Sequence, residues 1–510
     1  MQTAAKTAFI MAILTLGSKF IGFIREMFLA NFFGASYIVD AYVVSVSIPG
    51  MIFAGILGAV STSFIPIFSK KYEEEGELQG NLFTSQVINL LIVISIISSI
   101  VGIVFSDQIV WIFANGFEGA TAELASFYVK ITFSYTLFTA TSGILESYLK
   151  YKNIFLSPII AGYSISLFGI AFIILSSYTN PYLLVFGIFV GNIVRAVIIW
   201  IIAYAKKYKH RFDLHITDTV KQIIALALPV FLGSTVSQIN IFVDKALATR
   251  LPEGSVAAIN YSNLLIGMIT GISTTIIATI LYPKMAQAFS QKNYNRLSNL
   301  YNSGVSILLI IGIPFSLGAM AFGELVIQIV YERGAFDPTA TKMTTIAFFF
   351  YAVGLVFMAL QPFLIQTFYS MHNTKTPLLI ATSGLIINIV ANLILVNYLA
   401  HGGLALGTSI ACATNTITLV YCIHKKTRIK TTSATGKKAL KVLFASVISV
   451  GIAYGFNVLV LSNIWMPRMI QLAIIVVIAA IIYFIILKLF KIKELMHIKE
   501  IFKITSKNEE

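Results

Sequence analysis

The stretch MIQLAIIVVIAAIIYFIIL, residues 469–487, carries no charged side chain. As an α-helix it is roughly 28 Å long, which matches the hydrocarbon core of a bilayer. Similar stretches recur along the chain. In total, 57% of its 510 residues are hydrophobic and only 11% are charged. One water-soluble core could not bury that much apolar surface, so most of the chain must be dissolved in lipid. The sequence therefore predicts an all-α polytopic membrane protein and excludes a soluble enzyme or a nucleic-acid-binding protein.

Division of the chain at its polar clusters predicts about fourteen membrane spans, since each span needs roughly 17 to 25 mostly apolar residues. The first six are expected near residues 5–33, 37–69, 82–106, 123–149, 154–177 and 181–205. The other eight are expected near residues 218–248, 256–289, 298–322, 338–371, 376–398, 402–424, 439–462 and 467–489. The N-terminal stretch, residues 5–33, is interpreted as a retained span rather than a signal peptide, because no small-residue cleavage site follows it.

The net charge of +15 is concentrated in short clusters between the apolar stretches. Basic loops, such as residues 206–211 and 425–430, alternate with loops that carry few basic residues and several acids, such as residues 107–123. This is the order that a fourteen-span chain with an internal N-terminus requires. Both termini are therefore predicted to be cytoplasmic, and anionic lipid is the expected counter-charge of the basic loops.

Two stretches in different halves of the chain resemble each other. Residues 56–70 and 271–284 both combine small side chains with a proline one turn from a basic end. The repetition predicts two six-helix halves of like topology and two extra helices. The predicted parts are a lobe at 1–210, a second lobe at 217–426, two further helices at 438–490 and a basic cytoplasmic tail at 491–510. The alternative is that apolar helices with proline and lysine at one end resemble one another by chance.

Several charged residues fall inside the predicted spans, where each costs at least ~2.5–3.5 kcal/mol unless it has a polar cavity or a partner. Lys19, Arg25 and Glu26 share an arc of roughly 120° on the first span. The others are Asp40, Glu146, Arg195, Asp244 and Lys245.

One interpretation of these charges is a water-filled cavity whose cations attract an anionic head group. Arg25 and Lys19 would suit a pyrophosphate, because guanidinium binds phosphate bidentately and ammonium binds it as a point charge. The structural alternative is that both cations pair with Glu26 or Asp40 and only hold helices together. Glu146 and Arg195 lie near the predicted cytoplasmic ends of their spans, and we expect them to reach the interface.

At these residues the sequence resembles the MurJ (MviN) lipid II flippases of the MOP exporter superfamily. The resemblance runs in order over nearly all of residues 1–425. It includes Ser18-Lys19-Phe20-Ile21-Gly22-Phe23-Ile24-Arg25-Glu26, Phe33-Gly34-Ala35 through Asp40-Ala41-Tyr42, Ile48-Pro49, Phe64-Ile65-Pro66-Ile67-Phe68, Leu228-Pro229, Gly254-Ser255-Val256, Ile280-Leu281-Tyr282-Pro283, Tyr331-Glu332-Arg333-Gly334-Ala335-Phe336-Asp337 and Lys375-Thr376-Pro377.

The resemblance implies two pseudo-symmetric six-helix lobes around a central cavity, with two C-terminal helices that form a lipid-facing groove. It implies a transporter of the bacterial inner membrane, not an enzyme, that moves undecaprenyl-pyrophosphate-linked peptidoglycan precursor (lipid II) from the inner to the outer leaflet by alternating access. Arg25, Glu26 and Asp40 match cavity residues of the family. Lys19 and Asn263 stand where the family usually carries cavity arginines.

The chain departs from the family pattern at two places. Residues 50–54, where family members typically carry arginine, read Gly-Met-Ile-Phe-Ala, and Asn263 is uncharged. Loss of two cations leaves an O-antigen or capsule-type lipid-linked oligosaccharide open as an alternative cargo. A cation-coupled drug antiporter is a further alternative, for which an acidic cavity without Lys19 and Arg25 would be expected.

The sequence contains no phosphate-binding glycine-rich lysine loop, so ATP hydrolysis within the chain is not expected. No cofactor is predicted beyond Na⁺, and the membrane potential could also drive transport. Some members of the resembled family bind sodium through spans 7, 11 and 12, and similar positions here are Asp244, Asn388, Asn392 and Thr408. Oxygen ligands around one carboxylate suit a hard monovalent cation. The alternative is that Asn388 and Asn392 form interhelical hydrogen bonds and that Asp244 pairs with Lys245 or Arg250.

Overall fold

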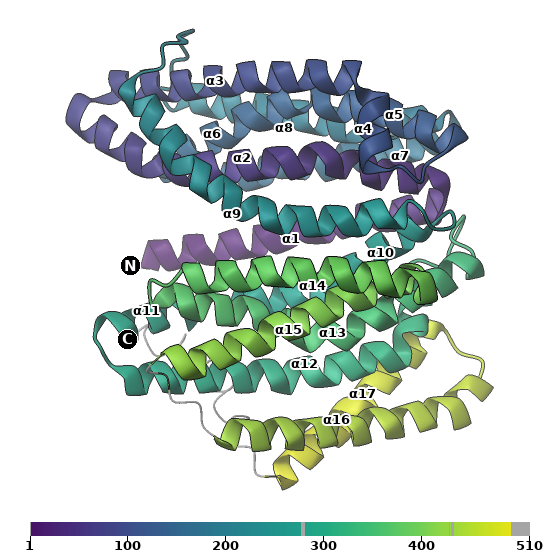
Figure 1. Cartoon of the computed structure of the whole chain (residues 1–510). Coiled ribbons are helices and arrows are strands. Elements are labelled where there is room, and N and C mark those ends of the chain that lie inside the picture. The colour runs from purple at the N-terminus through teal and green to yellow at the C-terminus, as the bar shows by residue number, and fades with distance from the viewer. Residues whose placement is uncertain (1, 277–280, 428, 430–432, 491–510) are drawn as a thin grey trace. The chain divides into compact units, whose positions relative to one another are not determined.

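The chain is built almost entirely of α-helices, as a computed structural model shows (Figure 1). The structure describes residues 2–276, 281–427, 429 and 433–490, and within these residues it contains no β-strand. The predicted tail at 491–510 lies outside the described residues. The all-α prediction is confirmed for the described part of the chain.

The helices follow the predicted spans closely. Those of the first half are α1 (Gln2–Phe33), α2 (Tyr37–Glu75), α3 (Glu77–Val104), α4 (Ser106–Phe113), α5 (Gly119–Ser134), α6 (Thr136–Tyr151), α7 (Leu156–Tyr178), α8 (Phe186–Ala205) and α9 (Asp218–Ala248). The remaining helices are α10 (Ser255–Ile276), α11 (Tyr282–Ser290), α12 (Tyr294–Val330), α13 (Pro338–Ser370), α14 (Lys375–Leu399), α15 (His401–Lys426), α16 (Ser433–Leu459) and α17 (Arg468–Leu489).

Ten helices in the described residues are long and apolar enough to cross a membrane. The other four predicted spans correspond to α1, to α9, to α5 with α6, and to α10 with α11. The predicted span at 123–149 is two 16-residue helices that meet at Tyr135, and α4 continues the third span as a separate short helix. About fourteen spans therefore account for the whole series of helices.

The chain divides into two compact units, which are residues 1–258 with 333–340, and residues 259–332 with 341–510. Helix α9 packs against α2 in the first unit, so this unit boundary lies one helix beyond the predicted lobe boundary at 210–217. The pseudo-symmetry of two six-helix lobes remains a prediction.

The first unit has an aromatic core at one end of its helices. The rings of Phe64 and Phe68 are stacked with centroids 5.2 Å apart, and Phe64 also stacks on Phe83 at 5.6 Å. Tyr148 and Tyr208 are fully buried in the same cluster. This core joins α2, α3 and α6 to the connection between α8 and α9.

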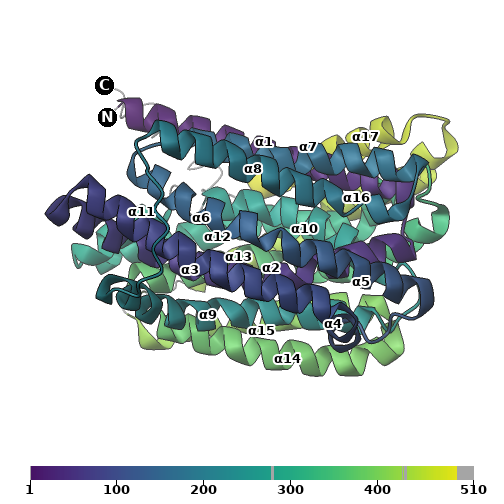
Figure 2. The same ribbon diagram turned by 90° about the horizontal axis from the view of Figure 1, so that it is seen from above.

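The connection between α8 and α9, residues 206–217, is hydrogen-bonded to polar side chains of α3 and crosses this helix in the view of Figure 2. Asn81 donates to the carbonyl of Lys207, and Asn89 donates to the carbonyls of Arg211 and Asp213. These contacts come from one face of α3, so the connection has a defined path.

Glycines allow α1, α7 and α8 to approach closely. A β-carbon at Gly187 would lie 2.9 Å from the Cα of Gly169, and one at Gly169 would lie 2.6 Å from the Cδ of Arg25. The position of Arg25 therefore depends on the absence of a side chain at Gly169 of α7 and at Gly187 of α8.

In the second unit α12, α16 and α17 pack together (Figure 1). Ile310 and Tyr483 belong to one apolar cluster of these helices, and the Tyr483 hydroxyl donates to the Ile310 carbonyl at 2.7 Å. Helices α14 and α15 form a separate antiparallel pair through a short turn at Ala400.

Candidate functional site

Arg25 and Glu26 form an ion pair on α1. The Arg25 Nη2 and Nε atoms lie 2.6 Å and 3.2 Å from the Oε1 atom of Glu26. Glu26 is only 5% exposed, whereas about a fifth of the Arg25 side chain is accessible. The arginine is thus neutralised locally but can still be reached by a ligand.

A second cation, Lys245, lies on α9 in the same unit. Its ammonium donates to the Ser47 hydroxyl of α2 at 2.5 Å. Sequence reasoning treated Lys245 only as a partner for Asp244. The sequence did carry one sign of a further role for Lys245. The residue lies in an apolar helix, and no acidic residue lies one turn away on the same face.

The cavity next to Ser47 has a volume of about 280 Å³. It is lined by Ser47, Gly50, Met51, Gln238, Ile241 and Phe242. The two polar side chains among these residues, Ser47 and Gln238, come from α2 and α9. This arrangement provides a small, partly polar space beside an intramembrane cation.

Asp40 has a structural role in the geometry seen here. Its Oδ2 atom accepts from the Gly254 amide and its Oδ1 atom from the Ala257 amide, both at 2.7 Å. Asp40 is 4% exposed and caps the first turn of α10, where free amides and the helix dipole favour a carboxylate. These bonds give Asp40 a structural role, but through backbone amides and not through the pairing with Lys19 or Arg25 that the structural alternative named.

Lys19 and Asn263 are both exposed. Lys19 precedes Arg25 by six residues, so it lies roughly 9 Å from Arg25 along the helix axis. Asn263 belongs to the second unit and Arg25 to the first. Among the described residues, the ion pair of Glu26 is with Arg25.

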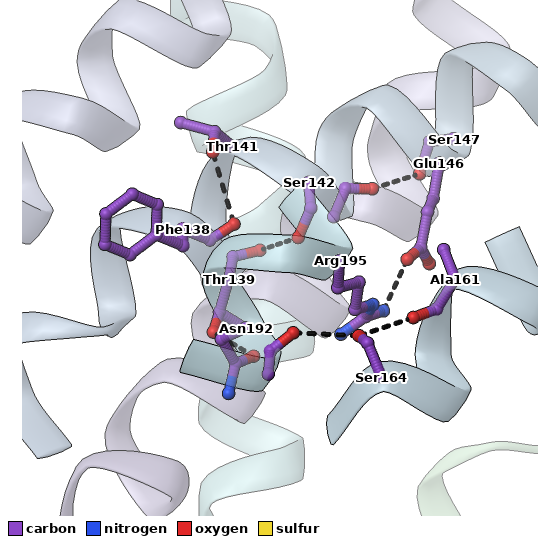
Figure 3. Close-up of polar contacts among 12 residues, drawn as sticks. Phe138, Thr139, Thr141, Ser142, Glu146, Ser147, Ala161, Ser164, Asn192 and Arg195 are labelled. Carbon is purple, nitrogen blue, oxygen red and sulfur yellow. Dashed lines mark hydrogen bonds and ion pairs between the residues drawn. The ribbon is translucent and has the colours of Figure 1, made fainter. Parts of the chain in front are cut away.

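Glu146 and Arg195 pair with each other between α6 and α8 (Figure 3). This ion pair gives both residues a structural role, and their reach to the membrane interface stays a prediction. One turn from Arg195, Asn192 accepts from the Thr139 hydroxyl at 3.2 Å. The Ser164 hydroxyl of α7 lies 2.8 Å from the carbonyl of Gly191 on α8. These three polar contacts hold α6, α7 and α8 together.

Three of the predicted sodium ligands lie together in the second unit. The Asn392 Nδ2 atom donates to Asn388 Oδ1 at 3.0 Å, and Asn388 Nδ2 donates to Thr408 Oγ1 at 3.4 Å. Both asparagines are fully buried between α14 and α15. The contacts support interhelical hydrogen bonding. Asp244, the predicted carboxylate ligand, is buried in the first unit.

An apolar groove of about 420 Å³ runs along the helices at the C-terminal end of the chain. It is lined mainly by α12, α16 and α17, and includes Pro314, Phe315, Gly318, Ser449, Val476, Ala480 and Phe484. Such a groove suits a long hydrocarbon chain.

Membrane-length helices with charged side chains inside the spans and an apolar groove define a multi-pass membrane transporter. The family described as lipid II flippase MurJ matches residues 29–467. The chain belongs to this family.

Relatives and solved structures agree with this assignment. A probable lipid II flippase MurJ from Buchnera aphidicola subsp. Baizongia pistaciae is 31% identical over 422 residues, covering 80% of each chain. One from Rickettsia prowazekii is 28% identical and covers 83% of this chain and 84% of the relative. A solved lipid II flippase MurJ in an inward closed conformation has 26% identity and a TM-score of 0.82, covering 94% of this chain and 98% of that one.

A multidrug resistance MATE family transporter of the MOP superfamily shares the fold. Its TM-score is 0.67 at 14% identity, over 84% of this chain and 99% of that chain. This likeness concerns the fold alone.

Proposed function

We propose that the chain moves lipid II, an undecaprenyl-pyrophosphate-linked peptidoglycan precursor, from the inner to the outer leaflet by alternating access. The family match over residues 29–467 carries this proposal. The chain is a multi-pass protein of the bacterial inner membrane, acts as a transporter rather than an enzyme, and has both termini in the cytoplasm.

Two features of the molecule support a lipid-linked pyrophosphate as cargo. Arg25 is a guanidinium in a membrane span that stays partly accessible while paired with Glu26, and guanidinium binds phosphate oxygens bidentately. The groove of α12, α16 and α17 is almost wholly apolar and can hold part of a prenyl chain.

The test is growth complementation in a bacterium depleted of its own flippase, with reconstituted flipping of labelled lipid II as the direct measurement. Wild-type chain should restore growth, and Arg25→Ala should abolish it because the head group loses its guanidinium. The conservative Arg25→Lys variant should retain part of the activity. Normal transport by Arg25→Ala would disprove the cationic-site mechanism.

A second cargo, an O-antigen or capsule-type lipid-linked oligosaccharide, is favoured by one observation. Asn263 is uncharged and residues 50–54 carry no cation, although family members usually carry arginine there. The reconstituted assay should therefore compare lipid II with such an oligosaccharide. Flipping of the oligosaccharide alone would replace lipid II as the cargo.

For the driving force we propose coupling to Na⁺ or to the membrane potential, with Asn388, Asn392 and Thr408, which lie together in the second unit, as candidate sodium ligands. Replacement of sodium by potassium should then slow transport, and Asn388→Leu should remove the difference between the two ions. Equal transport and equal melting temperatures in the two ions would leave the asparagines with a purely structural role.

A further inference from the structure

Lys245 lies on the face of α9 that lines the cavity next to Ser47. The cavity residues Gln238, Ile241 and Phe242 precede Lys245 by seven, four and three positions. This is the spacing of neighbours on one face of an α-helix. The acceptor of its ammonium, Ser47, lines the same cavity. The ammonium therefore lies at the edge of this space.

The local partner of Lys245 is unusual for a cation inside a membrane span. A cation at this depth costs at least ~2.5–3.5 kcal/mol, and a cation that only joins helices would be expected to pair directly with a carboxylate. Its hydrogen bond is to the neutral hydroxyl of Ser47, which takes one of the three ammonium hydrogens. Lysine in this state can still bind an anion.

Arg25 is the other cation of this unit that a ligand could use. It donates two bonds to Glu26 on the same helix, α1, and about a fifth of its side chain stays accessible. The unit therefore offers an arginine on α1 and a lysine on α9, and the hydrogen-bond partner of the lysine is a hydroxyl.

We propose that Lys245, together with Arg25, binds the pyrophosphate of the transported lipid, and that Glu26 neutralises Arg25 until the head group arrives. The inference rests on the proposed function, because it names a further binding residue of the same site. It gives to Lys245 the role that the sequence suggested for Lys19, whose side chain is exposed.

Binding is measured with the full-length chain in nanodiscs of phosphatidylcholine and phosphatidylglycerol. The probes are lipid II, undecaprenyl pyrophosphate without sugar, and undecaprenyl monophosphate. Lys245→Gln should weaken binding of both pyrophosphate lipids at least about tenfold, the range of a lost charged hydrogen bond. The monophosphate should be affected less, and Lys245→Arg should bind nearly as well as wild type.

Lys221→Gln is the matched control, because Lys221 is an exposed cation near the start of the same helix and pairs with Asp218. It should bind all three lipids like wild type. Melting temperatures are recorded for each variant. If Lys245→Gln is unstable, Ser47→Asp replaces it, since a carboxylate at this position would hold the ammonium and should weaken pyrophosphate binding to a similar extent.

The outcomes separate this inference from the proposed cargo. Wild-type binding of undecaprenyl pyrophosphate that depends on Lys245, without binding of lipid II, would keep the inference and reject the cargo. Undiminished binding of both pyrophosphate lipids by Lys245→Gln would reject the inference and keep the cargo. A wild-type chain that binds neither would reject both.

Discussion

At the scale of single residues, Asp40 uses its charge to join two distant parts of the chain. Its carboxylate accepts from the amides of Gly254 and Ala257, more than 200 positions away in the sequence. It supplies from another helix the acceptor that an N-cap residue usually supplies.

Asp40→Ala should lower the free energy of unfolding by about 2 kcal/mol, because two amides of α10 lose a charged acceptor. Asp40→Asn keeps one acceptor oxygen and should lose about half as much. Thermal unfolding in detergent checks both variants. A ligand role would give the opposite pattern, with unchanged melting of Asp40→Ala and lost transport.

The pair of Glu146 and Arg195 gives a second prediction. Either Glu146→Gln or Arg195→Gln alone should destabilise the chain by about 3 kcal/mol, because one charge remains in a largely buried site without its partner. The double variant should be more stable than the sum of the single changes implies. Denaturant titration of the three variants in detergent measures this coupling, and strictly additive effects would show that the pair contributes nothing.

These residues show what the sequence could reveal about the site. A charge in an apolar span is visible in the sequence and signals a partner, and this is how Arg25, Glu26, Asp40 and Lys245 were singled out. The partner itself depends on which helices pack together. The acceptor of Lys245 is Ser47, 198 residues away, and nothing in the neighbourhood of either residue predicts that contact.

At the scale of elements, the connection between α8 and α9 is an ordered structure. Gln86 donates to Asp213 at 2.7 Å and accepts from Thr217, which in turn caps α9. Hydrogen bonds from the His215 amide and from Gln86 hold the pKa of Asp213 down to about 2. Burial beside Trp200 and Tyr208 lowers the pKa of His210.

The lowered pKa of His210 predicts a dependence of stability on pH. The folded chain favours the neutral imidazole, so the stabilisation is complete above the ordinary pKa of about 6.5 and is lost as the pH falls below it. The melting temperature in detergent should drop between pH 7.5 and pH 5.5. In His210→Phe, which keeps a ring against Trp200 but cannot be protonated, that drop should be smaller. Parallel curves for the two proteins would count against the prediction.

The helices themselves were largely predictable, because apolar length alone indicates a span. The break at Tyr135 was not, since no proline or glycine stands there. The chain forms a tight turn at this point, with the Phe138 amide donating to the Tyr135 carbonyl at 3.0 Å. Helix α4 was missed because Ser106, Asp107 and Gln108 interrupt the apolar pattern of α3, and the apolar run that follows, residues 109–113, is too short to predict a span.

At the scale of the whole molecule, the groove of α12, α16 and α17 predicts that the protein selects its cargo by the length of the prenyl chain. Gly318→Trp should fill the groove and weaken binding of undecaprenyl-linked pyrophosphate about tenfold, since a prenyl segment loses its apolar contact. A farnesyl-linked analogue, which is too short to need the groove, should be affected little. Binding of both lipids in nanodiscs measures the difference.

Ile481→Trp is the matched control for the groove, because Ile481 is exposed on α17 and is not among the residues that line the groove. It should bind the long lipid like wild type. Equal loss for long and short lipids in Gly318→Trp would indicate a general distortion and contradict the role of the groove.

Sequence repetition and helix packing divide the molecule at different places. Repetition in the sequence suggested a boundary at 210–217, but α9 packs on α2 in the first unit. Sequence repetition reflects how halves of a chain correspond, whereas compact units reflect which helix surfaces are buried against each other. The two need not coincide at a connecting helix.

The close approach of α1, α7 and α8 has a consequence for the history of the sequence. Gly187 touches the backbone at Gly169, and Gly169 in turn touches the stem of Arg25. An alanine at Gly187 would press on the backbone of α7 at Gly169, and an alanine at Gly169 would push aside the Arg25 stem that carries the guanidinium. Descendants that acquire alanine at either glycine should therefore carry compensating changes in the packing of α1, α7 and α8 if they keep the arginine in place.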